Sequence, residues 1–308
     1  MVITKRGLAR PAVLSALVSA TTLLPVGAQP VFRSGTEAVS ISVSVKRGNV
    51  PLPNLVSTDF RLLDNGVVQA VDAFSVESVP LDLTLVVDTS GSTAGALDRM
   101  AKDVVAIGSL MRPDDQFRLL TIGVAINTVI PWQRGALVTT PTLRATSGVS
   151  LVYDALFAAL AHTPGEGRRH LVIALTDGRD CGSVIDGEKL LATGGVSEAV
   201  LHWIVVDARG AFDPQAAPAW CTPLDGGAVD YVRQTVERSG GARHTGLLGD
   251  PTVRTFKGVL SDFRQSYVLR YSPRGVDAAG WHTVKVEVPS YRDVRISARA
   301  GYLSGSSR

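Results

Sequence analysis

Two short, almost continuous apolar runs constrain the fold most strongly. They are Leu83-Thr84-Leu85-Val86-Val87 and Leu171-Val172-Ile173-Ala174-Leu175. Runs of this length without alternation are typical of strands buried on both faces, as in a parallel sheet covered by helices. Strand-like and helix-like segments alternate along residues 81–263. The sequence therefore predicts an α/β fold, with a Rossmann-like, mostly parallel sheet and helices on both faces.

The flanking segments, residues 36–79 and 266–302, contain only strand signals. Apolar and polar residues alternate from Val39 to Lys46, and this period of two marks a strand with one buried face. Asp64-Asn65-Gly66 lies between two apolar runs, where Asn-Gly is a strong hairpin signal. Neither segment alone is large enough for a secure core. We therefore expect the two to pair into one small β-sandwich, with the α/β domain inserted between them.

The first 28 residues have the pattern of a secretory signal peptide. A basic start is followed by a nearly apolar stretch of about 16 residues, from Pro11 to Val26, which ends in small residues. An uncleaved membrane anchor is the alternative, but the stretch is short for a spanning helix of roughly 20 residues. We expect an exported protein, periplasmic or secreted, with no membrane contact apart from that alternative anchor.

The charge of the chain follows from the same segment. The formal net charge is +3, and residues 1–28 hold three basic and no acidic residues, which leaves 3 − 3 = 0 for the remainder. A mature chain with no net charge lacks the excess of basic residues that is typical of nucleic-acid-binding proteins, so we expect no nucleic-acid partner.

One loop carries the clearest chemical signal. Asp88-Thr89-Ser90-Gly91-Ser92 follows the first apolar run and presents one carboxylate and two hydroxyls, those of Ser90 and Ser92, at alternate positions. Loops at the carboxyl ends of parallel strands form the binding crevice of such sheets, and oxygen ligands suit a hard cation such as Mg²⁺. Asp177 follows the second run and is expected at the same edge. The alternative is an Asp/Ser/Gly turn that caps the next helix.

Between these two loops, a helix is predicted over residues 152–160. Ser150 lies just before it, at a natural N-terminal capping position. Asp115 and Asp154 are interpreted as solvated or capping residues. The histidines are scattered along the chain, and each is interpreted as a surface or packing residue.

At this point the chain resembles a known family. Asp88, Ser90 and Ser92 match the Asp-x-Ser-x-Ser of the metal-ion-dependent adhesion site (MIDAS) in von Willebrand factor A (VWA) domains. The resemblance implies that Asp177 is the later acidic ligand. Ser150 falls where the family usually has Thr, a departure that keeps the hydroxyl, and Thr146 is a less favoured substitute because it lies farther from the helix start.

The flanking segments extend the resemblance to exported bacterial relatives of VWA domains. The matching stretches are Asp59 to Gly66 before the domain, and Tyr267 to Pro273 with Ala300-Gly301-Tyr302 after it. The resemblance implies a divalent-metal-dependent protein-binding module. Mg²⁺, or Mn²⁺ or Ca²⁺, would keep an open coordination position, and an Asp or Glu of an unidentified partner protein would fill it.

Other classes of function fit the sequence less well. We expect no enzyme, because the Gly-x-Ser-x-Gly elbow, the phosphate loop and the His-Glu-x-x-His motif are all absent from the sequence. One alternative is an envelope assembly or scaffold protein with a structural or vestigial metal site. The other, less favoured, is a metal-assisted hydrolase in which Asp177 is the base.

The chain has two cysteines, Cys181 and Cys221. Both are expected in loops that leave the carboxyl edge of the sheet, and export would allow a disulfide to form and persist. A Cys181–Cys221 bridge would brace the rim of the metal site. It would close a loop of 221 − 181 = 40 residues, worth about 4 kcal/mol in the chain-entropy model. Two free thiols are the alternative.

Overall fold

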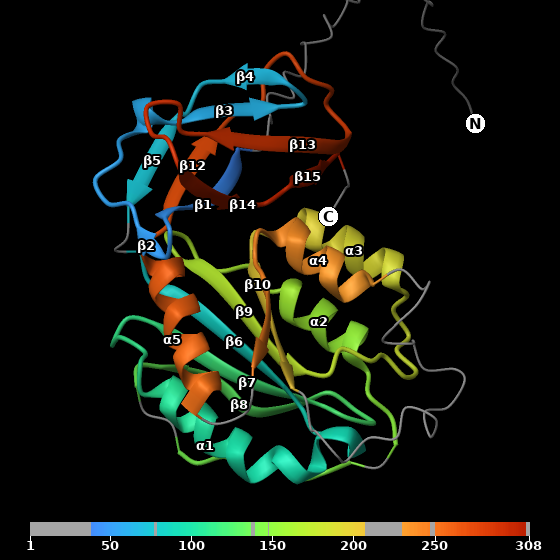
Figure 1. Cartoon of the computed structure of the whole chain (residues 1–308). Helices are drawn as coiled ribbons and strands as arrows, with labels where there is room; N and C mark the ends of the chain where they lie inside the picture. The colour runs from blue at the N-terminus through green and yellow to red at the C-terminus, as the bar shows by residue number, and fades with distance from the viewer. Residues whose placement is uncertain are drawn as a thin grey trace, which may run out of the picture. The chain divides into compact units, whose positions relative to one another are not determined.

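A central α/β domain and two antiparallel sheets make up the protein in the computed structural model (Figure 1), which describes residues 38–76, 79–136, 139–146, 148–206, 230–246 and 250–305. The described residues all belong to one compact unit. The predicted signal peptide, residues 1–28, lies outside them, as does Cys221, and the side chain of Ser92 is also outside the description.

The central sheet has six strands in the order β11-β10-β9-β6-β7-β8. All neighbours are parallel except β8, which pairs antiparallel with β7 at one edge. Every residue of β6 is buried, which is why the sequence shows an almost continuous apolar run there. The strands are β6 (Leu81–Asp88), β7 (Gln116–Ile122), β8 (Asn127–Arg134), β9 (Arg169–Thr176), β10 (Val200–Val206) and β11 (Arg243–Gly246).

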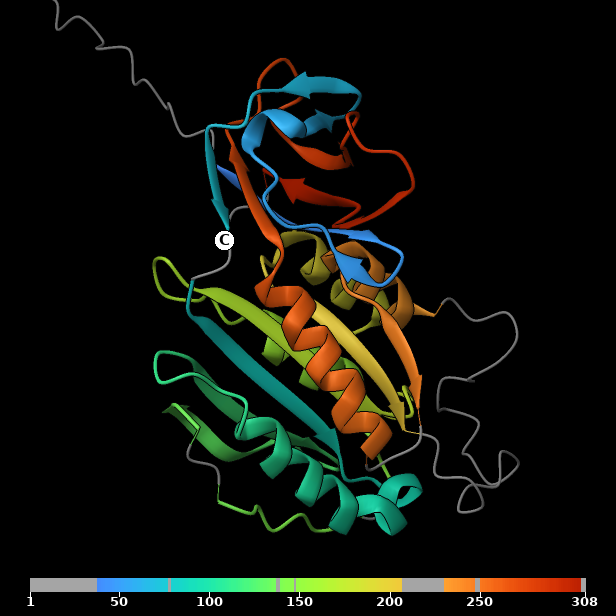
Figure 2. The same cartoon turned by 60° about the vertical axis from the view of Figure 1, so that its left-hand side comes forward.

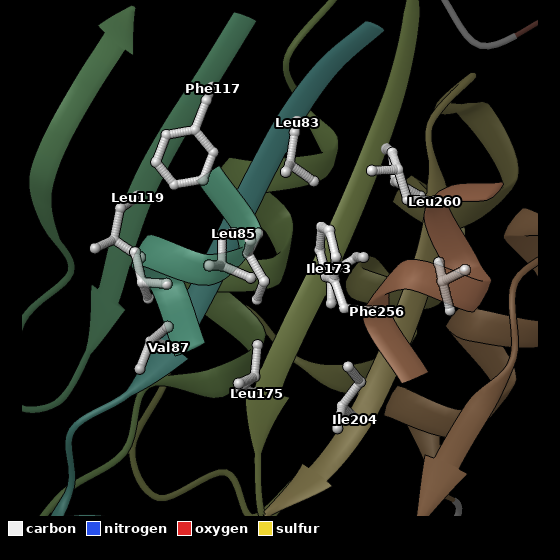
Figure 3. Close-up of a cluster of buried hydrophobic side chains, with 14 of the residues drawn as sticks. Leu83, Leu85, Val87, Phe117, Leu119, Ile173, Leu175, Ile204, Phe256 and Leu260 are labelled. Atoms are coloured by element: carbon white, nitrogen blue, oxygen red, sulfur yellow. The ribbon is translucent and has the colours of Figure 1, made fainter. Parts of the chain in front are cut away.

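Helices cover both faces of this sheet. On one face lie α1 (Leu97–Gly108) and α5 (Asp250–Arg264), which are side by side in Figure 2. On the other lie α2 (Val152–Leu160), α3 (Gly187–Val196) and α4 (Tyr231–Ser239). Alternate strand residues pack into two separate cores, and Figure 3 shows the one beneath α1 and α5, where Leu85, Ile173 and Phe256 meet. The predicted fold class, a mostly parallel sheet with helices on both faces, is confirmed.

The two antiparallel sheets, which we call the β module, combine strands from both ends of the chain. One has the order β14-β1-β12-β5 with β2 beside β1, and the other β15-β13-β3-β4. The strands are β1 (Val39–Arg47), β2 (Val50–Pro51), β3 (Arg61–Asp64), β4 (Val67–Gln69), β5 (Ala73–Val76), β12 (Tyr267–Tyr271), β13 (Gly280–Glu287), β14 (Val294–Ala298) and β15 (Gly301–Ser304). Both sheets contribute to one hydrophobic cluster, which includes Ile41, Leu62 and Tyr267.

A polar group lies inside this cluster. The carboxylate of Asp64 is fully buried. It accepts hydrogen bonds from Tyr271 at 2.9 Å and Tyr302 at 2.7 Å, and its Oδ1 lies 2.8 Å from Nδ1 of His282. Because these partners come from β12, β13 and β15, the group ties the C-terminal strands to β3. No local sequence pattern predicts this buried polar group.

Local turn signals are borne out by the backbone. Asn65 and Gly66 have φ angles of 46° and 82°, as the predicted hairpin between β3 and β4 requires. Gly240 ends α4 with a φ of 85°, and a Cβ there would lie 2.7 Å from the backbone nitrogen of Arg299. Helix α3 and strand β11 were not predicted. A 3-10 turn over Gly91–Ala96 precedes α1.

Among the helices that the structure describes, none is both long enough and apolar enough to span a bilayer.

Candidate metal site

The predicted site residues gather at the carboxyl edge of the central sheet, between β6 and β9. These neighbouring strands are in register up to Val87 opposite Leu175, so the next residues, Asp88 and Thr176, emerge side by side. Since β7 lies on the other side of β6, chain order reverses at this point. Ligand crevices of open α/β sheets form at such reversals.

Asp88 is the centre of the arrangement. Its side chain is fully buried, and its Oδ2 accepts hydrogen bonds from the hydroxyls of Thr176 at 2.6 Å and Ser150 at 3.2 Å. Its Oδ1 accepts from the backbone N–H of Ser90 at 2.9 Å. All of these donors are neutral, so they orient the carboxylate without cancelling its charge.

The electrostatic surroundings of Asp88 favour a cation. Burial, followed by the negative charge of Asp177, raises the pKa of Asp88, and hydrogen bonds from Ser90 and Thr176 only partly oppose this. No Lys, Arg or His of the described chain forms an ion pair with Asp88. A buried carboxylate beside a second carboxylate is costly without positive charge nearby. A divalent ion would supply that charge.

Hydrogen bonds between loops hold this edge together. The backbone N–H of Thr89 donates to the carbonyl of Ile122 at 2.8 Å, and that of Thr146 donates to Thr89 at 2.8 Å. The N–H of Cys181 donates to the carbonyl of Ser150 at 2.7 Å. The loops after β6, β8 and β9 and the end of β7 are thereby linked before any ligand binds, which is how preorganised sites are built.

The turn after β9 is shaped by Gly178. Its φ is 87°, and a Cβ there would lie 2.2 Å from the ring of Trp203. Trp203 itself donates from Nε1 to the carbonyl of Thr176 at 2.9 Å, while the N–H of Gly178 donates to the Thr176 hydroxyl at 3.0 Å. The tight turn therefore fixes Thr176 from both sides.

The structure brings together most of the predicted residues. Asp88, Ser90 and Ser150 are in hydrogen-bond contact, and Asp177 is close enough for its charge to act on Asp88. The Asp177 carboxylate also accepts from the N–H of Arg179 at 3.0 Å. That Ser92 is a metal ligand remains a prediction, and so does the Cys181–Cys221 bridge.

Two local interpretations are wrong. Ser150 does not cap α2, which begins after Leu151 without a side-chain cap, because the Ser150 hydroxyl donates to Asp88 instead. Asp115 is not solvated: it is buried and accepts from the backbone N–H of Leu81 and from Arg264. Thr146, the less favoured substitute, directs its hydroxyl to the carbonyl of Thr89 at 3.3 Å.

Sequence reasoning missed Thr176. The signal was present, because Thr176 ends the second apolar run directly before Asp177. Asp88, Ser90, Ser150, Thr176 and Asp177 are the described residues that could hold a metal ion. No group of three or more His, Cys, Asp or Glu side chains suited to a metal occurs among the residues described. The candidate set is instead two carboxylates with hydroxyls, a donor set for a hard cation.

Comparison with known proteins gives no match to a protein-family model and none to a curated protein. Solved structures of similar fold include a von Willebrand factor type A protein from Catenulispora acidiphila, with 13% identity over 89% of this chain and 65% of that one, at a TM-score of 0.44.

Two further solved structures are similar to part of this chain. One is an aerotolerance-related membrane protein from Bacteroides fragilis, with 12% identity over 59% of this chain and 98% of that one, at a TM-score of 0.42. The other is proximal thread matrix protein 1 from the mussel byssus with a zinc-occupied MIDAS motif, with 16% identity over 65% of this chain and 49% of that one, also at a TM-score of 0.42. These likenesses concern the fold.

Proposed function

We propose that this protein is an exported, divalent-metal-dependent protein-binding module that captures an Asp or Glu side chain of a partner protein. The metal would be held by Asp88, Ser90, Ser92, Ser150 and Asp177, with Thr176 beside them. The observation that carries the proposal is the buried Asp88 carboxylate, which receives only neutral hydrogen-bond donors and lies close to Asp177.

The residues of the chain have distinct parts in this proposal. Thr176 and Ser150 orient the Asp88 carboxylate, and Asp177 adds negative charge at the open side of the edge, where it is only partly buried. When bound, Mg²⁺ or a similar ion would supply an electrophilic position for a partner carboxylate. The linked loops would keep that position fixed.

Export is the second part of the proposal and is supported by the pattern of residues 1–28. In an oxidising compartment, a Cys181–Cys221 disulfide would brace the loop that hydrogen-bonds to Ser150. The buried position of Cys181 is compatible with such a bridge.

Calorimetric titration of the purified chain with Mg²⁺ and Mn²⁺ tests the metal site. Asp88→Asn keeps the shape of the side chain and removes its charge, so we expect it to abolish binding. Asp277→Asn is the matched control, because Asp277 is exposed and lies in the β module. A folded wild type that binds neither ion would overturn the metal-dependent function and favour the scaffold alternative.

Partner capture is tested with the same variants. Envelope proteins would be passed over immobilised protein in Mg²⁺ and in chelator. We expect a partner that is retained only with metal, by the wild type and by Asp277→Asn but not by Asp88→Asn. Equal retention in chelator would show that binding does not use the metal site.

A further inference from the structure

A cavity that is separate from the candidate metal site lies where the β module meets the central α/β domain. Its volume is about 380 Å³, which is in the range of small-molecule sites. One wall comes from β1 and β14. The other comes from the amino-terminal parts of β10 and β11 and from the end of α5. The candidate metal site follows the carboxyl ends of β6 and β9, so the two sites lie at opposite edges of the parallel sheet.

The wall from the β module is polar and cationic. Ser42, Ser44 and Lys46 alternate along β1 with the residues that enter the hydrophobic cluster, and all three line the cavity. In the pairing of β1 with β14, Ser44 lies opposite Ser297, and Lys46 lies opposite Arg295. Like charges directly opposite each other destabilise a sheet, so this pair is costly without an anion nearby.

Only one cavity carboxylate offsets these cations. Lys46 is ion-paired with Asp262 of α5. Arg295 is exposed and forms no ion pair with any residue that the structure describes. Arg243, at the start of β11, contributes to the opposite wall, but its guanidinium lies over the ring of Trp203 at 5.0 Å, on the other face of the sheet from the cavity. The side chains on the cavity face thus include two cations, Lys46 and Arg295, and one carboxylate, Asp262.

Two histidines add hydrogen-bonding capacity to the wall formed by β10 and β11. Nδ1 of His202 lies 3.0 Å from Nε2 of His244. In such a contact one ring nitrogen carries a proton and donates it, and the other ring nitrogen is unprotonated and accepts. Burial lowers the pKa of His202 to about 3, and the pKa of His244 is lowered by the same cause. At neutral pH the pair is therefore uncharged.

A further cation lies behind the cavity. Arg169 is partly buried, and burial lowers its pKa to about 10. Its N–H groups donate to Ser42 Oγ at 3.1 Å, Ser266 Oγ at 2.6 Å and the carbonyl of Phe263 at 2.9 Å, all of them neutral acceptors. Ser42 and Ser266 line the cavity. The Ser42 hydroxyl oxygen accepts from Arg169, so the Ser42 hydroxyl hydrogen is available to donate to a ligand.

From these observations we propose that the cavity binds a small organic anion, with a phosphate or carboxylate head and a short apolar body. Arg295 and Lys46 would bind the head, since both side chains donate charged hydrogen bonds to phosphate and carboxylate oxygens. The Ser42, Ser44 and Ser297 hydroxyls would complete its coordination. Val200, Val259 and Phe263 line the same cavity and would contact the body. This ligand does not depend on the metal site.

The test is calorimetric titration of the full chain, stripped of metal on a chelating resin, with inorganic phosphate, phenyl phosphate and benzoate. We expect saturable binding of one molecule per chain, tighter for phenyl phosphate than for phosphate because of the apolar wall. Benzoate distinguishes a carboxylate from a phosphate head. If none of the three saturates, the proposal is overturned.

Variants locate the binding. Arg295→Gln and Lys46→Gln are each expected to weaken it about tenfold or more, the loss of a charged hydrogen bond. Asp262→Asn is expected to strengthen it, because the carboxylate is removed and Lys46 is released. Arg292→Gln is the control, since Arg292 is exposed on the β module but lies outside the cavity. Equal weakening by Arg292→Gln, or none by Arg295→Gln, would refute the site.

Discussion

Thr176 is the residue whose replacement tests the architecture of the metal site most sharply. Its side chain is fully buried, its hydroxyl donates to Asp88 Oδ2 at 2.6 Å, and the same oxygen accepts from the N–H of Gly178 at 3.0 Å. Thr176→Val keeps the size and branching of the side chain but removes both hydrogen bonds. The effect therefore comes from the hydroxyl and not from a cavity.

The magnitude follows from these two contacts. A hydrogen bond to a charged group contributes about 1.5–3 kcal/mol, and a buried N–H left without an acceptor costs about 1–3 kcal/mol. The two terms share one oxygen and are not fully additive, so we expect Thr176→Val to lower the free energy of unfolding by roughly 2–4 kcal/mol. Groups that orient a metal ligand typically change metal affinity by about 10- to 100-fold, and we expect a loss in that range.

Urea unfolding and Mn²⁺ calorimetry measure the two effects separately. Thr176→Ser is the matched control, because it keeps the hydroxyl, and we expect it to bind Mn²⁺ nearly as well as the wild type. Two results would refute the reasoning. One is a folded Thr176→Val protein with wild-type Mn²⁺ affinity. The other is a Thr176→Ser protein that loses as much affinity as Thr176→Val, since the hydroxyl would then not be the cause.

Three further predictions concern stability. Burial lowers the pKa of His170 to about 3, below its unfolded value of about 6.5. Between these two pH values the unfolded chain therefore binds one more proton than the folded chain. The free energy of unfolding should fall as the pH drops through that window, by at most about 1.4 kcal/mol per pH unit. His170→Gln should flatten this slope in urea titrations at pH 6.5 to 4, and an unchanged slope would show that His170 is not the group. Asp64→Ala leaves the His282 and tyrosine donors buried without their acceptor and should cost roughly 2–4 kcal/mol by urea unfolding, whereas a loss below about 1 kcal/mol would mean that water replaces the carboxylate. Gly178→Ala combines a positive φ with a clash against Trp203, so its thermal midpoint should fall by several degrees, and a midpoint at or above the wild-type value would contradict the strained turn.

The strength of the local signals explains what could be predicted. Strands β6 and β9 are buried on both faces, so every position favours an apolar residue and the run is visible without any knowledge of its neighbours. Because strands of a parallel sheet end at a common edge, the placement of Asp88 and Asp177 near each other followed from the fold class alone. The Asn65-Gly66 turn could also be predicted from neighbouring residues alone, because few residue types other than Asn and Gly adopt the positive φ angles that the turn requires.

Contacts that depend on register could not be predicted in the same way. The pairing of Val87 with Leu175 brings Thr176 to the carboxylate of Asp88, and the loop that carries Ser150 arrives there instead of capping its own helix. A shift of one residue in that pairing would have turned the Thr176 hydroxyl away, because successive strand side chains point to opposite faces. Sequence spacing gives the order of these residues along the chain but not that alignment.

The polar face of β1 shows where the sequence stops and the tertiary structure decides. Alternation from Val39 to Lys46 determined by itself that one face packs into a core and that the other is polar. It left open whether the polar face meets water or protein, since serines and a lysine are compatible with both. Only the packing of β10, β11 and α5 against that face makes Ser42, Ser44 and Lys46 the wall of a cavity. Side-chain polarity is a local property of the chain, whereas the enclosure of a surface depends on segments that are far apart in sequence and meet only in the folded molecule.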